Sequence, residues 1–161
     1  LFRSSAASDV YKRQMATSQE SGVSVGSISS IVGLAKNHAR LDKTAADDPV
    51  IRDDIMKMMI RQEAQRQNNR RSGVPALTDH PMRIPLQSKL VSTEINQDLA
   101  EIAYRIEGIG SSLYVNDDNA AAGGQWQLAY MNSFGVTIAA GANEVQRNIL
   151  GERVLGLPKS K

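Results

Sequence analysis

Few side chains in this sequence could carry out catalysis or hold a metal ion. The chain has 161 residues and no cysteine, which excludes disulfide bonds and thiolate metal sites. Its two histidines, His38 and His80, lie far apart in the sequence and lack the spacing of metal-ligand pairs. The basic residues Arg66, Arg70 and Arg71 fit a solvated helix end. We therefore assign no chemistry to these groups.

The polar residues near the C-terminus belong to a strongly patterned helical segment. They are Gln146, Arg147, Glu152 and Arg153. We interpret them as forming ion pairs and subunit contacts rather than a catalytic group. Trp126, which precedes them, is interpreted as a core or interface residue.

The composition favours packed helices and excludes several classes of protein. Apolar residues make up 41% of the chain and aromatic residues only 4%, whereas strands draw on aromatic and β-branched side chains. A net charge of +2 without a clustered basic face predicts no nucleic-acid partner. No run approaches the ~18 apolar residues of a membrane span, and no signal-peptide pattern is present. We expect a cytoplasmic helical domain.

Residues 1–14, LFRSSAASDVYKRQ, are expected to lie outside the folded domain. They have neither helical nor strand periodicity, and Met15 follows them directly. The string resembles translated adapter sequence at the end of an assembled gene, which would break the reading frame here. A native disordered arm is the alternative. We predict a leader over 1–14 and one domain over 15–161.

Apolar spacing predicts four long helices joined by loops, without strands. They cover about 28–42, 49–71, 86–110 and 126–155, the last with a break at Gly141. The second helix has a clear start, because Asp48 is suited to the N-cap and Pro49 to the first helical position. The predicted apolar positions are Ile28, Ile31, Val32, Ala35, Ile51, Ile55, Met58, Met59, Leu86, Leu90, Ile95, Leu99, Ile102, Ile106, Ile109, Ala129, Tyr130 and Phe134. An all-α antiparallel four-helix bundle is the expected fold.

The C-terminal segment carries the most specific pattern, WQLAYMNSFGVTIAAGANEVQRNILGERVLGLPKSK. A helix led by Trp126 is followed by the break at Gly141, the run 144–148 (EVQRN) and the ending 152–158 (ERVLGLP). This pattern resembles the C-terminus of bacterial acyl-CoA dehydrogenases, and weaker similarity extends back to about residue 20. The resemblance is greatest to a divergent branch that includes actinobacterial enzymes acting on branched or steroid-derived acyl groups.

The resemblance implies the C-terminal domain of a larger flavoenzyme. Family members consist of an N-terminal helical domain, a middle β domain and a C-terminal helical bundle, with FAD between the last two. A carboxylate removes the α-proton of an acyl-CoA thioester while hydride passes from the β-carbon to the flavin, leaving a 2-enoyl-CoA. A homo- or hetero-oligomer (dimer or tetramer) through the bundle and an electron-acceptor flavoprotein are also implied. Without a β domain, residues 15–161 are expected to be inactive and to bind no FAD stably.

The identity of the catalytic base stays open. In many family members it is a glutamate directly before the glycine of the C-terminal break, and here that position is Ala140. In other branches the base lies on the first helix of the bundle, where Glu20 is the only carboxylate between residues 15 and 41. The resemblance therefore implies Glu20 as the catalytic residue. The alternative is that Glu20 is a solvated residue near a ragged terminus.

The substrate and flavin contacts also follow from the resemblance. Gly141 matches the substrate-binding glycine whose backbone approaches the thioester. Ala142, Asn143 and Glu144 match the flavin-contacting run, although Ala142 lacks the hydroxyl often found there, so only backbone contact is implied at that position.

A second cofactor segment is implied at the end of the third helix. Arg105 and Gly108 match the residues that reach the FAD adenine of a neighbouring subunit. Arg105 replaces the usual glutamine and could equally be an exposed helix residue. The family's Phe-Gly loop, which grips the flavin pyrophosphate, is absent from 41–44 (LDKT).

Three functions remain open at this point. The first is a fragment of an active acyl-CoA dehydrogenase. The second is a non-catalytic structural subunit of a heteromeric acyl-CoA dehydrogenase, which Ala140, Ala142 and the missing Phe-Gly loop favour. The third is a freestanding helical interaction module, which the specific C-terminal pattern argues against.

Overall fold

The computed structural model describes residues 27–78 and 84–159, which are mainly helical. The α-helices are α2 (Ile28–Asn37), α3 (Pro49–Arg71), α4 (Pro75–Thr78), α5 (Ile84–Glu107), α6 (Gln125–Ile138) and α7 (Asn143–Arg153). Single 3-10 turns cover Ala45–Asp47, Gly108–Ser112 and Ala121–Gly124. The predicted all-α class is confirmed.

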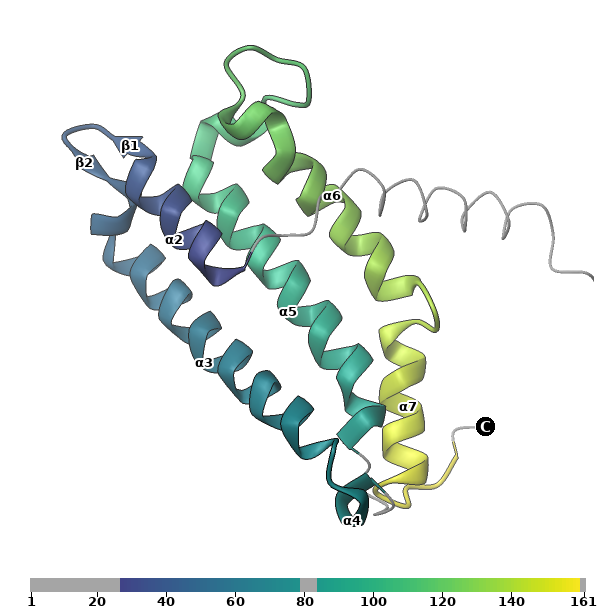
Figure 1. Cartoon of the computed structure of the whole chain (residues 1–161). Helices are drawn as coiled ribbons and strands as arrows, with labels where there is room; N and C mark the ends of the chain where they lie inside the picture. Colours follow the sequence, from purple (N-terminus) through teal and green to yellow (C-terminus); the bar gives the residue numbers. More distant parts are fainter. Residues whose placement is uncertain (1–26, 79–83, 160–161) are drawn as a thin grey trace, which may run out of the picture.

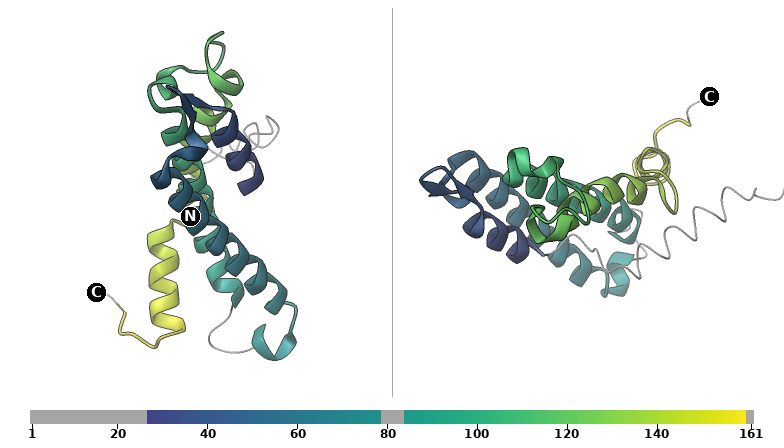
Figure 2. Two further views of the ribbon diagram at one scale, coloured as in Figure 1. Left: turned by 90° about the vertical axis from the view of Figure 1, so that its left-hand side faces the viewer. Right: turned by 90° about the horizontal axis from the view of Figure 1, so that it is seen from above.

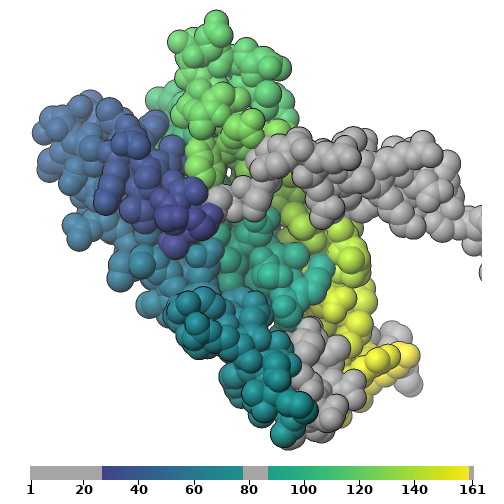
Figure 3. Space-filling model, viewed as in Figure 1, coloured from purple at the N-terminus to yellow at the C-terminus, as the bar shows by residue number. Residues whose placement is uncertain are grey.

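Helix α5 is the centre of the bundle, because α2, α3, α6 and α7 all pack against it. Helix α3 runs antiparallel to α5 on one side, and α6 and α7 follow each other along the other side (Figure 1). Seen from the side, α7 diverges from α3 (Figure 2). The segment 108–124 covers one end of the bundle in the space-filling view (Figure 3).

The core is aliphatic and lies between α2, α3, α5 and α6. Its buried side chains are Ile31, Ala35, Ala45, Ile51, Ile55, Met58, Ile95, Leu99, Ala100, Ile102, Ala103, Ile106 and Ala129. Trp126 and Tyr130 are partly buried and pack against it. Most of the predicted apolar stripe of α5 is therefore in the core, as the helical spacing implied.

Three predicted apolar positions face solvent instead. Ile109 is 94% exposed, because the helix ends at Glu107 and Gly108 has a left-handed backbone with φ of +57°. Helical spacing no longer applies beyond that point. Met59 and Phe134 are about half exposed.

The segment after α2 also differs from the prediction. The helix ends at Asn37 rather than near Asp42, and a small hairpin follows, with β1 (Ala39–Arg40) paired antiparallel to β2 (Lys43–Thr44). Arg40 stabilises this hairpin by donating hydrogen bonds to Asp48 and to the backbone oxygens of Arg105 and Ile106. The prediction of a strand-free chain was therefore wrong. Tertiary contacts at the end of α5 decide this local structure.

The other helix boundaries lie close to the predicted ones. The Asp48 carboxylate accepts a hydrogen bond from the Val50 N–H at 2.8 Å, so it caps α3 as expected. The predicted connection 72–82 contains the short helix α4. Helix α7 ends at Arg153, two positions before the predicted Leu155.

Candidate functional site

The turn between α6 and α7 has an unusual backbone conformation. Ala140 and Gly141 both have positive φ, at +53° and +97°. A left-handed backbone is uncommon for alanine, and a Cβ on Gly141 would lie 2.7 Å from the Gln146 Nε2. The φ angle therefore favours glycine at 141, whereas the close contact involves only the end of the flexible Gln146 side chain, which can move.

A lysine from α5 holds this turn in place. The Lys89 ammonium donates to the backbone oxygens of Thr137 at 3.2 Å and Gly141 at 2.8 Å. It also donates to the Asn143 Oδ1 at 2.8 Å. The Thr93 hydroxyl lies 3.1 Å from the same Asn143 oxygen. The end of α6, the turn and the start of α7 are thus tied to one point on α5.

Asn143 and Glu144, which follow the turn, differ in their exposure to solvent. Asn143 is 4% exposed, whereas Glu144 is exposed and lies 3.8 Å from the Arg147 guanidinium. Arg147 also forms an ion pair with Glu94 of α5. The interpretation of Arg147 as an ion-pairing residue is therefore confirmed. Ala140 offers no proton acceptor at the surface of the turn.

The second predicted group lies at the other end of α5. Arg105 is half exposed and forms an ion pair with Asp54 of α3 at 2.7 Å. Gly108 is exposed, and a Cβ there would meet no atom within 4 Å. Lys89 and Arg105 are sixteen positions apart on α5, or about 24 Å at 1.5 Å per residue. The structure therefore does not bring the two predicted cofactor segments together within this chain.

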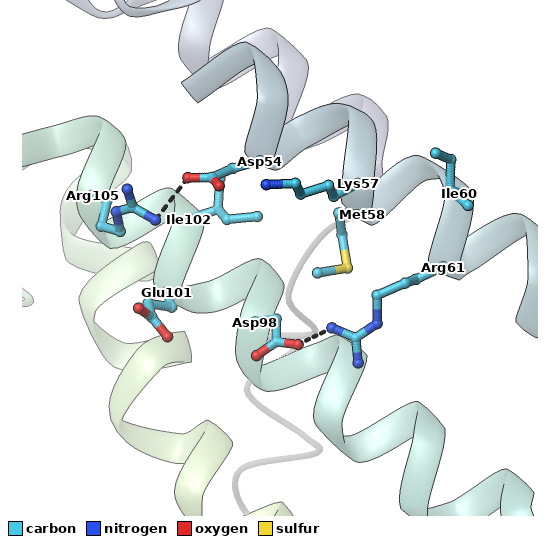
Figure 4. Close-up of a pocket in the computed structure, with 9 residues that line it drawn as sticks. All are labelled: Asp54, Lys57, Met58, Ile60, Arg61, Asp98, Glu101, Ile102 and Arg105. Atoms are coloured by element: carbon cyan, nitrogen blue, oxygen red, sulfur yellow. Dashed lines mark hydrogen bonds and ion pairs between the residues drawn. The ribbon is translucent and has the colours of Figure 1, made fainter. Parts of the chain in front are cut away.

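A surface groove of about 460 Å³ lies between α3 and α5 (Figure 4). Its lining residues are Asp54, Lys57, Met58, Ile60, Arg61, Asp98, Glu101, Ile102 and Arg105. Two ion pairs, Arg105 with Asp54 and Arg61 with Asp98, join its two walls. Because these charges neutralise one another across the groove, we assign no catalytic role to it.

A buried carboxyl group lies beside Gly108. Glu107 is 3% exposed, and one of its oxygens accepts a hydrogen bond from the Gln127 amide of α6. Burial raises the pKa of Glu107 above its ordinary value, and the Gln127 hydrogen bond lowers the pKa by a smaller amount. Within the described ranges, the second oxygen of Glu107 and the Gln127 Oε1 are buried without a hydrogen-bond partner.

Sequence reasoning missed Lys89, Arg40 and Glu107. Lys89 directly precedes Leu90, and Glu107 directly follows Ile106, so each charged residue adjoins a buried position of the α5 stripe. That adjacency does not single them out, because Glu101 lies between the buried Ala100 and Ile102 and is exposed. The partners were not readable, because the Lys89–Gly141 contact joins residues 52 positions apart.

Two classes of site are absent from the part of the chain that the structure describes. It contains no group of three or more His, Cys, Asp or Glu side chains that could hold a metal ion. None of its helices is both long enough and apolar enough to cross a membrane. Glu20 lies outside the described residues.

Comparison with known proteins gives the family. The model for the acyl-CoA dehydrogenase C-terminal domain matches residues 10–155. This chain belongs to the acyl-CoA dehydrogenase family. In that family's pattern, the α6–α7 turn is the segment predicted to approach the thioester and the flavin.

Two curated acyl-CoA dehydrogenases are similar over most of the chain. Acyl-CoA dehydrogenase IpdE1 of Mycolicibacterium smegmatis is 35% identical over 134 residues, which cover 81% of this chain and 30% of that protein. Acyl-CoA dehydrogenase IpdE1 of Mycobacterium tuberculosis is 30% identical over 158 residues, which cover 98% of this chain and 38% of that protein. The chain thus spans about a third of the length of these curated acyl-CoA dehydrogenases.

A solved structure shares the fold of this acyl-CoA dehydrogenase domain. The ChsE4-ChsE5 complex from Mycobacterium tuberculosis matches with a TM-score of 0.68 at 21% identity. The match covers 83% of this chain and 35% of that chain. At this identity the likeness supports the helical fold alone.

Proposed function

We propose that this chain is the C-terminal domain of an FAD-dependent acyl-CoA dehydrogenase. The reaction is α,β-dehydrogenation of an acyl-CoA thioester to a 2-enoyl-CoA. The α6–α7 turn supports the proposal, because Gly141, which the resemblance assigns to the substrate, has a positive φ and a backbone oxygen held by Lys89. The match of the family model over 10–155 supports it.

The residues of the turn fit an oxygen-bearing ligand through their backbone. Helix α7 has no side-chain cap at Ala142, so its first N–H groups remain available for an acceptor. We propose that Gly141 contacts the thioester and that Ala142, Asn143 and Glu144 contact FAD. Arg105 and Gly108 would contact the FAD of a neighbouring subunit. The bound FAD supplies the redox chemistry.

We propose Glu20 as the base that removes the substrate α-proton. A carboxylate suits this task because the thioester carbonyl, when hydrogen-bonded, acidifies the α-carbon. Ala140 cannot accept a proton, so the base has to come from another segment.

The test uses the complete protein, including the sequence encoded in frame before Met15. We expect a flavin absorbance spectrum and dehydrogenation of acyl-CoA thioesters with an artificial electron acceptor. Glu20→Gln should lower kcat by about 10²–10⁴-fold while flavin absorbance is retained. The exposed α5 variant Glu101→Gln is the matched control and should keep full activity. Undiminished activity of Glu20→Gln would rule out the base assignment.

The reading frame itself provides a second test. An uninterrupted frame without flavin-binding domains before Met15 would refute the enzyme proposal for this chain. Residues 15–161 alone should bind no FAD, and a visible-range flavin spectrum from that segment would contradict this expectation.

Ala140 favours a second candidate, a non-catalytic subunit of a heteromeric acyl-CoA dehydrogenase. The ChsE4-ChsE5 complex, which shares the fold, is named for two different proteins, and we extend a hetero-oligomeric arrangement to this chain as part of the proposal. We propose a cytoplasmic oligomer formed through the bundle, with an electron-acceptor flavoprotein as redox partner. If the purified protein dehydrogenates only after a homologous subunit is added, and Glu20→Gln has no effect, the second candidate is correct.

A further inference from the structure

Lys89 has an unusual set of partners for a lysine on a bundle helix. Its ammonium has three acceptors, the Thr137 and Gly141 backbone oxygens and the Asn143 Oδ1. In residues 27–78 and 84–159 it forms no ion pair with a carboxylate, unlike Lys57, which pairs with Asp53. Its partners lie in the last turn of α6, in the α6–α7 turn and at the start of α7. Lys89 therefore links α5 to the segment that joins α6 and α7.

These contacts fix the direction of one peptide group in the turn. The Gly141 carbonyl points at Lys89, and the peptide bond to Ala142 is trans and planar. The Ala142 N–H must therefore point away from α5. No residue in the described part of the chain accepts a hydrogen bond from it, and Gly141 is exposed. The turn thus presents a backbone donor outward.

The strained conformation requires a cause outside the turn itself. Ala140 with φ of +53° is disfavoured by roughly 1–2 kcal/mol relative to a right-handed backbone. Such residues persist when the surrounding structure over-determines them. Lys89 provides contacts on both sides of this position, at Thr137 before it and at Gly141 and Asn143 after it. Thr93 adds a further contact to Asn143.

We propose that Lys89 is a positioning residue of the site, which orients the Gly141–Ala142 peptide toward the acyl thioester and flavin. This inference rests on the proposed function for the ligand that the turn meets. The orientation of the turn by Lys89 is independent of the proposed function, because it involves only residues of this chain. Lys89 acts through the backbone and does not itself contact the reacting atoms.

The first experiment measures the turn in the 161-residue chain. Lys89→Met removes the ammonium and keeps the apolar stem, and Lys36→Met, on the exposed last turn of α2, is the matched control. Amide hydrogen exchange is followed by NMR at Ala139 and Gln146, whose N–H groups form the hydrogen bonds flanking the turn. We expect both amides to exchange at least about tenfold faster in Lys89→Met than in the wild type, because charge-assisted hydrogen bonds are lost. The Ile55 amide in α3 should be unchanged, which excludes global unfolding.

A second variant covers the case in which Lys89→Met does not fold. Lys89→Gln keeps a neutral donor, so its exchange rates should lie between those of the wild type and Lys89→Met. Exchange at Ala139 and Gln146 equal to that of Lys36→Met, in whichever Lys89 variant folds, would overturn the inference.

The second experiment measures kinetics in the complete flavoprotein. Lys89→Met should lower kcat by about 10- to 100-fold, because a misplaced peptide group no longer aligns the substrate. Flavin content and KM should change much less, and Lys36→Met should leave activity unchanged. Faster exchange without a fall in kcat would overturn the positioning role. If the wild-type protein has no dehydrogenase activity, the proposed function is refuted. Faster exchange in Lys89→Met would then still show that Lys89 holds the turn.

Discussion

Glu107 lies buried at the end of α5 beside Gln127, and we expect Glu107→Gln to stabilise the fold at neutral and basic pH. In the wild type, one oxygen of each side chain accepts no hydrogen bond from the described residues. A carboxamide at 107 can donate to the Gln127 Oε1 while accepting from the Gln127 Nε2. The substitution therefore gives the unpaired Gln127 oxygen a donor and removes a buried charge.

The sign of the pH dependence follows from the pKa of Glu107. Burial raises the pKa of this carboxyl above its ordinary value of 4.5, so the folded state binds the proton more tightly than the unfolded state. The contribution of Glu107 to stability is then greatest below pH 4.5 and is lost as the pH rises through the folded-state pKa of this group. The slope is at most about 1.4 kcal/mol per pH unit. Glu107→Gln abolishes this loss.

The magnitude follows from the buried acceptors. A buried oxygen without a partner costs about 1–3 kcal/mol. We therefore expect Glu107→Gln to raise the free energy of unfolding by about 1–3 kcal/mol at pH 8 and by about zero at pH 4. At about 2–4 °C per kcal/mol for a domain of this size, Tm should rise by roughly 2–12 °C at pH 8.

Urea unfolding followed by circular dichroism at pH 4, 6 and 8 checks this expectation. Glu101→Gln, an exposed substitution on the same helix, is the control and should shift neither the stability nor its pH dependence. A Glu107→Gln variant that is less stable than the wild type at pH 8 would refute the reasoning. The reasoning would also be refuted if the free energy of unfolding changed between pH 4 and pH 8 by the same amount in Glu107→Gln as in the wild type.

Two further predictions concern backbone conformation and capping, and both are checked by urea unfolding. Gly124→Ala should destabilise the fold by more than about 2 kcal/mol, because Gly124 has φ of +78° and an added Cβ would lie 2.5 Å from the Val115 nitrogen. Gly110→Ala, where the Cβ meets nothing within 4 Å, should change stability by less than about 1 kcal/mol, and equal effects would contradict the argument. Asp48→Ala should cost about 1–2 kcal/mol, mainly through loss of the α3 cap and in smaller part through loss of the Arg40 ion pair. Asp53→Ala, which removes only an exposed ion pair, should cost about 0.5 kcal/mol or less, and a cost as large as that of Asp48→Ala would contradict the capping role.

The sequence predicted the helices where local signals agree with the final packing. Asp48 and Pro49 mark the start of α3, and the spacing of Ile95, Leu99 and Ile102 marks the buried face of α5. Such signals act within a few turns of one helix, so they can be read without knowing the partners.

Prediction failed where a distant contact decides the local conformation. The hairpin after α2 forms around Arg40, whose acceptors Arg105 and Ile106 lie 65 and 66 positions away. Apolar spacing continued through Gly108 to Ile109, but the left-handed glycine ends the helix and turns Ile109 to solvent. A periodic pattern carries no information about either event.

The candidate site divides in the same way. The sequence by itself determined the family through the pattern from Trp126 to Pro158, and it located the break at Gly141. Only the tertiary structure decided how that break is held, because Lys89 meets Gly141 across 52 positions of sequence. It also decided that Arg105 and the turn lie at opposite ends of α5. The physical reason is that residue spacing fixes which face of a helix a side chain occupies, whereas packing fixes what that face meets.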